Sequence, residues 1–454
     1  MAPVVIRLDA ARSPIEALAR FAELPNLCLL QSASPEHPLS RFSYLAADPV
    51  ATISAPAEQW QSACAAIRST FAPQESTDMR LPPFRGGWMG WLGYDLAVAL
   101  DDVARHPTQS TPVPDIMLGL HDWVIAWDHA DGSTWLVSTG IDSTGQRDPV
   151  RAQARAWPVL ARWNADDVTD RPHNTSSNVR PQADISAATY QTAVARVIDY
   201  ILAGDIFQAN LAQRFAGPFR GDPLALYADL VRRSPAPMAA FIRHQDVAIV
   251  SASPEQFIRL DAATRRVETR PIKGTRPRDA NAARDAALAQ ELLASAKDRA
   301  ENVMIVDLLR NDLSRVCRPG TVQAPVLCAL ESHSTVHHLV SLVTGELERR
   351  HDAMDLIAAT FPGGSITGAP KLRAMAIIRE LEIVARGVYS GAIGWIGLDG
   401  SMDTSIAIRT VTIAAGTASC HAGGGITALS VPADEYQETL DKAQAMLAAV
   451  AATA

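Results

Sequence analysis

The stretch 239–277, AAFIRHQDVAIVSASPEQFIRLDAATRRVETRPIKGTRP, decides the fold class. It contains four short apolar runs, at 239–243, 247–251, 257–260 and 267–272, and polar residues separate them. Connections this short join antiparallel strands, because parallel strands need a crossover of a dozen or more residues. The stretch therefore predicts consecutive antiparallel strands.

Helical patterns and further strands surround this stretch. Helices are expected over 187–203, 222–233, 281–313, 371–379 and 435–451, and strands over 28–32, 41–47, 392–398 and 405–413. The runs 123–127 and 134–137 around Asp131-Gly132 carry a hairpin signal. Runs of strands separated from runs of helices predict an α+β fold with antiparallel sheets rather than a βαβ series.

Composition places the chain among globular proteins. Its 454 residues are about three times the roughly 150 of a common domain. Hydrophobic residues make up 48% and charged residues 20%, which excludes a disordered or fibrous chain. The net charge of −8 gives no overall positive field to hold nucleic acid or an anionic membrane. Any anionic ligand therefore needs a local site.

The cysteines and the N-terminus bear on the compartment. Five widely spaced cysteines without a CxxC pair argue against a disulfide framework or a cysteine zinc site. The N-terminus has no signal-peptide pattern, and no run of about 18 apolar residues occurs. We therefore expect a cytoplasmic protein that is neither secreted nor membrane-spanning.

A polar segment, DDVTDRPHNTSSNVRPQADI at 166–185, has no apolar period and is predicted to be a surface linker. It divides the chain into an N-terminal region, 1–165, and a C-terminal region, 186–454.

Lysine is scarce, and one lysine stands out. The four lysines are Lys273, Lys297, Lys371 and Lys442, whereas 37 of the 41 basic residues are arginines. Lys273 ends an apolar run and is flanked by three arginines, at 270, 276 and 278. Neighbouring guanidinium groups disfavour a second cation, which would favour a neutral, nucleophilic amine. The alternative is a solvated lysine at a strand end.

Carboxylates recur at helical spacing. Asp298 and Glu301 form one i,i+3 pair, and Glu435 and Glu438 form another. Two such helix faces would supply oxygens that suit Mg²⁺, which takes one or two carboxylates together with waters and a substrate oxygen. The alternative is two solvated acidic faces, and Lys442 could then be only an i,i+4 partner of Glu438.

Two glycine-rich segments and one arginine are further candidates. The segments 363–371 and 422–426 could bind an anion through backbone N–H groups, but neither matches a P-loop or a dinucleotide motif. Arg409 lies in an apolar run, so it either faces inward toward an anion or occupies the solvent face of an edge strand. His337 and His338 are adjacent in a predicted strand, so they should face opposite sides.

These segments together resemble the family of chorismate-utilising enzymes, which includes anthranilate, aminodeoxychorismate, isochorismate and salicylate synthases. The resemblance covers nearly all of 186–451. Its motifs, in order, are GDIFQANLAQRF, SASPEQF, RPIKGTRPR, KDRAENVMIVDLLRND, FPGGSITGAPK, GAIGWIG, MDTSIAIRT, AGGGI and EYQETLDKA. Upstream, LLQS, SRFSYLAADP and GGWMGWLGYD resemble the N-terminal half of the anthranilate and aminodeoxychorismate members. The fold that this implies is two antiparallel sheets packed as a sandwich with helices outside.

Within the family, PIKGT resembles component I of aminodeoxychorismate synthases, since anthranilate synthases have alanine in place of Lys273. The resemblance implies a transferase in which Lys273 attacks C2 of chorismate with loss of the C4 hydroxyl, before ammonia enters at C4. The product would be 4-amino-4-deoxychorismate, on the route to 4-aminobenzoate and folate. Gln208 stands where water-using members carry a base lysine, and Glu255 matches the acid that protonates the leaving oxygen.

The resemblance also assigns the remaining positions. Glu301 and Glu438 match the Mg²⁺ ligands, while Asp298 and Glu435 match outer carboxylates; Asp298 stands where glutamate is common. Further substrate-binding positions are implied at Gln208, Thr275, His338, Ser365, Tyr389, Arg409, Gly423, Gly425 and Lys442. Lys371 lies in a family motif without a chemical role, and Lys297 has no assigned place. Ser32, Pro235, Pro237 and Met238 resemble a tryptophan pocket.

Partners follow from what the chain lacks. No cysteine lies in the GxCxG context of a glutaminase, so a separate glutaminase subunit should deliver the ammonia, and another enzyme should make 4-aminobenzoate. The main alternative is anthranilate synthase component I, against which Lys273 speaks. Two other hypotheses are a catalytically silent regulatory subunit, which the retained Lys273, Glu255, Glu301 and Glu438 disfavour, and a metal-dependent phosphotransferase, which lacks a phosphate-cradle motif.

Overall fold

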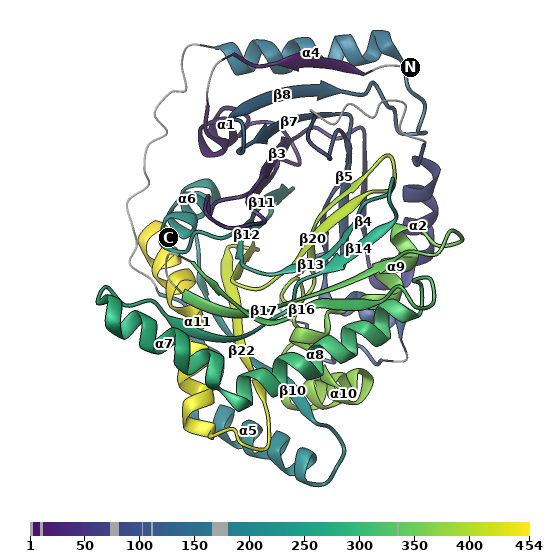
Figure 1. Ribbon diagram of the computed structural model, residues 1–454. Coiled ribbons are helices and arrows are strands. Elements are labelled where there is room, and N and C mark those ends of the chain that lie inside the picture. The colour runs from purple at the N-terminus through teal and green to yellow at the C-terminus, as the bar shows by residue number, and fades with distance from the viewer. Residues whose placement is uncertain are drawn as a thin grey trace.

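Two large antiparallel sheets form the framework of the computed structural model (Figure 1), which describes residues 3–9, 12–72, 81–101, 103–109, 112–165, 180–333 and 336–454. The first sheet has the strand order β1 (Val4–Arg7), β8 (Ser133–Ser138), β7 (Trp123–Asp128), β3 (Phe42–Ala46), β2 (Cys28–Gln31), β11 (Met238–His244), β12 (Val247–Ser253), β21 (Thr410–Ala414), β22 (Thr417–Ile426), β10 (Gln208–Pro218) and β18 (Gly368–Ala369), with β9 (Gln182–Ala183) beside β10.

The second sheet has the order β15 (Ile272–Pro277), β17 (Val336–Glu346), β14 (Arg266–Thr269), β13 (Gln256–Leu260), β20 (Met402–Ile406), β19 (Ala392–Gly397), β5 (Gly87–Leu92), β6 (Ile116–His121) and β4 (Ala51–Ala55), with β16 (Gln323–Ser332) beside β17. The helices are α1 (Pro14–Arg20), α2 (Trp60–Ser69), α3 (Ala97–Leu100), α4 (Pro149–Asn164), α5 (Ala187–Leu202), α6 (Pro223–Arg233), α7 (Ala282–Ala294), α8 (Ala296–Ser314), α9 (Ala353–Thr360), α10 (Lys371–Leu381) and α11 (Pro432–Thr453), with short 3₁₀ turns η1 (Ala57–Gln59), η2 (Tyr94–Leu96) and η3 (Gly364–Ile366). None of the helices in these described ranges is long and apolar enough to cross a membrane.

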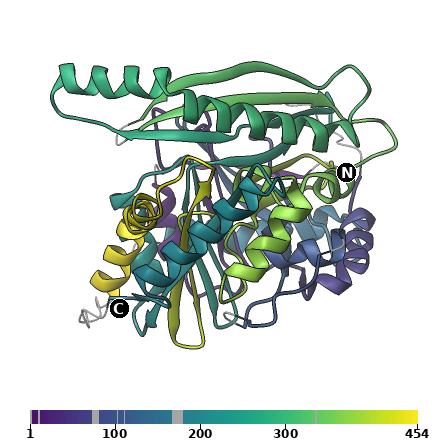
Figure 2. The same cartoon turned by 90° about the horizontal axis from the view of Figure 1, so that it is seen from below.

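The apolar core is layered as a sandwich. One buried cluster joins β2, β3, β11 and β12 of the first sheet to β5, β6 and β19 of the second, and it includes Tyr44, Trp91 and Trp395. On the outer faces, a second cluster joins α1, α4, α6 and α11 to the first sheet, and a third joins α2, α8 and α9 to the second. Figure 2 shows α7 and α8 along one side of the molecule, beside β16 and β17. The predicted α+β sandwich with helices outside is confirmed.

Both regions of the chain contribute strands to both sheets. In the first sheet β2 pairs with β11, and in the second β5 pairs with β19. The predicted hairpin is confirmed, since Trp127 of β7 pairs with Thr134 of β8. Of the predicted linker, 166–179 lie outside the described residues, and Gln182–Ala183 form β9.

Three predicted elements are interrupted. The expected strand 405–413 divides into β20 and β21, because the chain leaves the second sheet and enters the first through Ala407–Arg409. The expected strand 267–272 ends at Thr269, and β15 begins at Ile272. The expected helix 281–313 divides at Ser295, whose side chain accepts from the Asp298 N–H and caps α8. The spacing of apolar residues in the sequence does not indicate where the chain leaves one sheet and enters the other.

Candidate active site

A cavity of about 670 Å³ opens between the ends of the two sheets and the helices α8 and α11. This volume lies within the range of small-molecule sites. The predicted site residues that line it are Glu255, Lys273, Thr275, Asp298, Glu301, His338, Ser365, Tyr389, Arg409, Gly423, Gly425, Glu435, Glu438 and Lys442. The fold thus brings together residues from seven separate motifs.

A break in strand pairing directs Lys273 into the cavity. The register of β15 against β17 shifts between Ile272 and Thr275, and Gly274 has a φ of +90°. A Cβ at Gly274 would lie 2.9 Å from the Cβ of Asp298, so no side chain fits there. Such a bulge re-aims the neighbouring side chain. On the far side of the bulge, the Thr275 hydroxyl lies 2.9 Å from Nδ1 of His338.

The electrostatic surroundings of Lys273 favour its neutral amine. Burial lowers its pKa, and the nearby cation Lys442 lowers it further, while the carboxylates of Glu301 and Glu255 oppose both effects. Among the described residues, its amine takes part in no ion pair and no hydrogen bond. Burial also holds the pKa of His338 at about 3, so this imidazole is uncharged.

The predicted cause of this lowered pKa was wrong. The three flanking arginines are occupied elsewhere: Arg270 pairs with Glu331, Arg276 with Glu291 and Asp298, and Arg278 with Asp285. Burial of the Lys273 amine and the positive charge of Lys442 lower the pKa instead, because tertiary packing determines which groups surround the amine.

Glu255 lies where the chain passes from the first sheet to the second, between β12 and β13. Its side chain is only 5% exposed. Burial raises its pKa, against the opposing effects of a hydrogen bond from Ser365 and the charge of Lys273. A carboxyl group whose pKa is raised can be protonated at working pH and donate that proton.

Arg409 occupies the opposite crossing, from the second sheet back to the first. Its φ of +52° belongs to the left-handed region, and its backbone carbonyl accepts from Ala252 N–H. Burial lowers the pKa of its guanidinium, against the opposing effect of Tyr389, and none of the ion pairs among the described residues involves it. Of the two sequence alternatives, the inward-facing arginine is therefore the correct one. Such a cation in the cavity lining is suited to a carboxylate ligand.

Four carboxylates from two helices share one wall of the cavity. Burial, together with the nearby charges of Asp298 and Glu435, raises the pKa of Glu301. Burial would raise the pKa of Glu438 as well, but the Lys442 ammonium 2.5 Å from its Oε1 brings it below its usual value. The Lys442 ammonium also donates to the Gly423 carbonyl at 2.9 Å, so this lysine is more than a helix-surface partner.

The two outer carboxylates have partners already. Arg276 donates to Asp298 at 3.2 Å, and the Ser430 hydroxyl donates to Glu435 at 2.6 Å. Lys297 approaches both helices, with its ammonium 4.0 Å from Glu301 and 3.8 Å from Glu435. The sequence suggested no role for Lys297. In the structure, its ammonium lies close to a carboxylate of each helix.

Glycines of β22 line the cavity beside α11. A Cβ at Gly423 would lie 2.3 Å from the Leu211 carbonyl, and one at Gly425 would lie 2.1 Å from the Gln208 amide nitrogen and 3.4 Å from the Lys273 amine. Gln208 therefore sits directly behind Gly425 rather than in the cavity lining. Its buried amide has no hydrogen-bond partner in the described part of the chain.

Sequence reasoning missed a buried support beneath the cavity. Arg386 and Glu382 form an ion pair in which both side chains are almost fully buried. Arg386 also donates to the Asn210 and Ile366 carbonyls, which belong to cavity-lining residues. His421 stacks on Tyr389 with ring centroids 5.1 Å apart. The Glu382–Arg386 pair has i,i+4 spacing in the sequence, whereas the contacts with Asn210 and Ile366 and the ring pair join residues far apart in the chain.

Two other predicted groups lie away from the cavity. Ser32 and Met238 are close neighbours at the ends of the paired strands β2 and β11, and the Ala33 N–H donates to the Ala236 carbonyl beside Pro235. Lys371 donates to buried Asp312 at 2.6 Å and to the Thr360 carbonyl, so its role is structural.

His337 and His338 point to opposite sides as predicted, since His337 contacts Ser332 and Asp285.

Comparisons with known proteins agree with this arrangement. The family model described as chorismate binding enzyme matches residues 26–448. The chain is 39% identical to aminodeoxychorismate synthase component 1 of Salmonella typhimurium, covering 98% of both chains, and 37% identical to anthranilate synthase component 1 of Thermus thermophilus, covering 96% and 95%. The crystal structure of anthranilate synthase component I from Streptococcus pneumoniae matches with a TM-score of 0.79 and 30% identity, covering 97% of this chain and 99% of that one.

Proposed function

The chain belongs to the family of chorismate-binding enzymes, and we propose that it acts as component 1 of an aminodeoxychorismate synthase, with Lys273 as a covalent nucleophile. The observation that carries the proposal is the partly buried Lys273, whose lowered pKa and freedom from any ion pair or hydrogen bond among the described residues make its amine available for attack. Relatives named as anthranilate synthases also match the chain, and the lysine is what favours the first activity.

The proposed reaction proceeds in two displacements. The neutral Lys273 amine forms a bond to C2 of chorismate, both ring double bonds shift by one position, and the C4 hydroxyl leaves as water after Glu255 donates its proton. The attached amine then gives up a proton, which restores neutrality. Ammonia next bonds to C4, both double bonds shift back, and the C2–N bond to Lys273 breaks as a proton from the incoming ammonia passes to the departing amine. Chorismate and ammonia thus become 4-amino-4-deoxychorismate and water.

The remaining charged groups suit the two carboxylates of chorismate. Arg409 is a partly buried cation without an ion-pair partner in the described chain, and it would pair with the enolpyruvyl carboxylate beside Tyr389. The glycine wall of β22 leaves room for the ligand against backbone groups. The ring would then lie between Lys273 and the acidic wall.

The acidic wall fits Mg²⁺. Its donors are hard carboxylate oxygens from two helices, and the raised pKa of Glu301 reflects its own burial and its repulsion from Asp298 and Glu435, which a divalent cation relieves. Glu301 and Glu438 would hold the ion, with Asp298 and Glu435 as outer groups that already have partners. When bound, the ion would neutralise the ring carboxylate of the substrate.

Product identity tests the proposal. Purified chain with chorismate, Mg²⁺ and an ammonium salt at alkaline pH is expected to give an amino product that keeps the enolpyruvyl group, as measured by mass spectrometry. Glutamine in place of ammonium should give no product unless a separate glutaminase subunit is added. Release of pyruvate with anthranilate would assign the sister activity instead, and no turnover with ammonium would contradict the proposal.

Lys297 supplies a prediction about the metal. Its ammonium competes with a cation for Glu301 and Glu435, so Lys297→Met is expected to tighten Mg²⁺ binding several-fold, measured by calorimetry. Arg310→Met, which removes a cation from the exposed end of the same helix, should leave the affinity unchanged. Equal or weaker Mg²⁺ binding in the Lys297 variant would contradict the prediction.

Two finer assignments remain part of the proposal. Ser32, Pro235 and Met238 would contribute to a tryptophan-binding site, and the chain would work in the cytoplasm on the route to 4-aminobenzoate and folate.

A further inference from the structure

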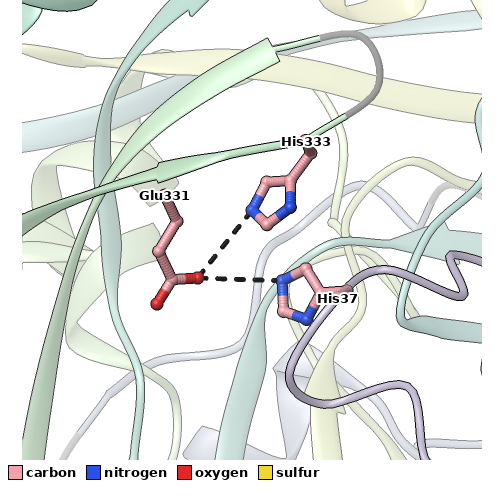
Figure 3. Close-up of side chains that lie close together, drawn as sticks. All are labelled: His37, Glu331 and His333. Atoms are coloured by element: carbon pink, nitrogen blue, oxygen red, sulfur yellow. Dashed lines mark ion pairs between the residues drawn. The ribbon is translucent and has the colours of Figure 1, made fainter.

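Two histidines and a glutamate converge outside the chorismate cavity (Figure 3). His37 comes from the loop between β2 and β3, Glu331 from the end of β16, and His333 from the residues that follow it. The Nε2 atom of His37 is 3.9 Å from Oε2 of Glu331, and that of His333 is 3.8 Å from the same oxygen. The two imidazole rings stack with centroids 4.4 Å apart.

The polar atoms that face one another in this cluster lack partners. Glu331 Oε2 and His333 Nε2 are buried and form no hydrogen bond with any described residue. The other oxygen of Glu331 is held by Arg270, which fixes the direction of the free one. Buried polar atoms are nearly always satisfied, so an unpaired acceptor facing two imidazoles calls for a ligand.

The imidazoles are in the uncharged form that binds metals. Burial lowers the pKa of His37 to about 3, and His333 and Arg270 lower it further. Burial also lowers the pKa of His333, against the opposing charge of Glu331. A protonated histidine pair bridged by the carboxylate is therefore disfavoured, because burial of the rings opposes their charging.

We propose that His37, Glu331 and His333 form a binding site for a divalent transition-metal ion such as Zn²⁺, separate from the acidic wall of the chorismate cavity. Two imidazoles and one carboxylate are a donor set that suits zinc and its neighbours, whereas Mg²⁺ prefers oxygen ligands alone. Donors bound tetrahedrally to zinc at about 2.1 Å lie roughly 3.4 Å apart. The two histidine–carboxylate separations of 3.8 and 3.9 Å thus need only a small contraction, and all three donor atoms lie within 4.8 Å of one another.

Two features set the expected strength of the site. The Leu39 N–H donates to Nδ1 of His37, so the proton of that ring is on Nε2 without metal. Metal binding at Nε2 moves this proton to Nδ1 and ends the Leu39 hydrogen bond. Arg270 also compensates the charge of Glu331, so the ion gains less attraction than at an unpaired carboxylate. We therefore expect micromolar rather than tighter affinity.

A bound ion would link two distant parts of the chain. The loop that carries His37 follows Ser32 in the N-terminal region, while the ring of His333 lies 5.7 Å from that of the cavity residue His338. The site would therefore fasten the loop after β2 to the strands that form one wall of the cavity.

Cobalt provides a direct probe, because Co²⁺ bound by imidazole nitrogens at low coordination number absorbs visible light far more strongly than Co²⁺ bound by oxygens. With Mg²⁺ in excess to fill the acidic wall, the full-length protein is expected to bind one Co²⁺ per chain with such a spectrum, and Zn²⁺ should displace it. His37→Gln and His333→Gln should each weaken Zn²⁺ binding at least tenfold, as measured by equilibrium dialysis.

A matched control is His351→Gln, since His351 also lies beside a carboxylate, 3.5 Å from Asp355, but belongs to no three-donor group among the described residues. It should bind Zn²⁺ as the unmodified chain does. Circular dichroism without metal verifies that each variant is folded. Zn²⁺ affinity that is unchanged in both His37 and His333 variants, or no Zn²⁺ binding at micromolar concentrations, would overturn the proposal. Neither result depends on the proposed synthase activity.

Discussion

Lys273→Ala is expected to slow chorismate turnover with ammonium by at least about 10³-fold, because removal of a nucleophile eliminates the covalent route. In the unmodified chain, burial and Lys442 lower the pKa of this amine. The neutral fraction at any pH below the ordinary lysine pKa is therefore larger than for an exposed lysine. In a plot of turnover against pH, the rise of activity on the acid side should therefore occur below the ordinary lysine pKa.

Lys273→Arg makes the test specific to the nucleophile. Arginine keeps the positive charge and much of the length, but it stays protonated in proteins and cannot attack. We expect it to be as inactive as the alanine variant, measured as initial rates of product formation by mass spectrometry. Mass analysis of quenched enzyme should show an adduct on the unmodified chain only. Activity within tenfold of the unmodified chain in either variant would exclude Lys273 as an obligatory nucleophile.

Glu255→Gln is expected to lower turnover by about 10²–10⁴-fold, which is the usual contribution of a general acid. Burial raises the pKa of Glu255, so the protonated acid persists to higher pH than an exposed glutamate would allow. The unmodified enzyme should lose activity on the alkaline side as this carboxyl group loses its proton. The glutamine variant cannot ionise, so that limb should disappear from its residual activity.

Ser365→Ala gives a graded check on the same group. The Ser365 hydroxyl opposes the raised pKa of Glu255, so its removal should move the alkaline limb of turnover to still higher pH. The direction follows because the hydrogen bond favours the carboxylate over the acid. An alkaline limb that stays in place in Ser365→Ala, or that survives in Glu255→Gln, would show that another group provides the proton.

Elements with a strong local period could be predicted from the sequence. The hairpin of β7 and β8 has a turn signal between apolar runs. Within 239–277, β11 pairs with β12 and β13 with β14, because short connections join antiparallel strands, although the chain changes sheet between β12 and β13. The pairs Asp298 with Glu301 and Glu435 with Glu438 were visible because i,i+3 residues share a helix face. Lys273 was found through its scarcity and through its motif.

What tertiary structure decided is where these parts meet and how each is charged. The run around Arg409 looks like one strand, yet the chain changes sheet there, and this turns the arginine into the cavity. The arginines beside Lys273 pair elsewhere, so its lowered pKa comes from burial and from Lys442, a residue 169 positions away. Local sequence fixes residue type and period, whereas desolvation and distant charges depend on packing, because they arise from groups that only folding brings together.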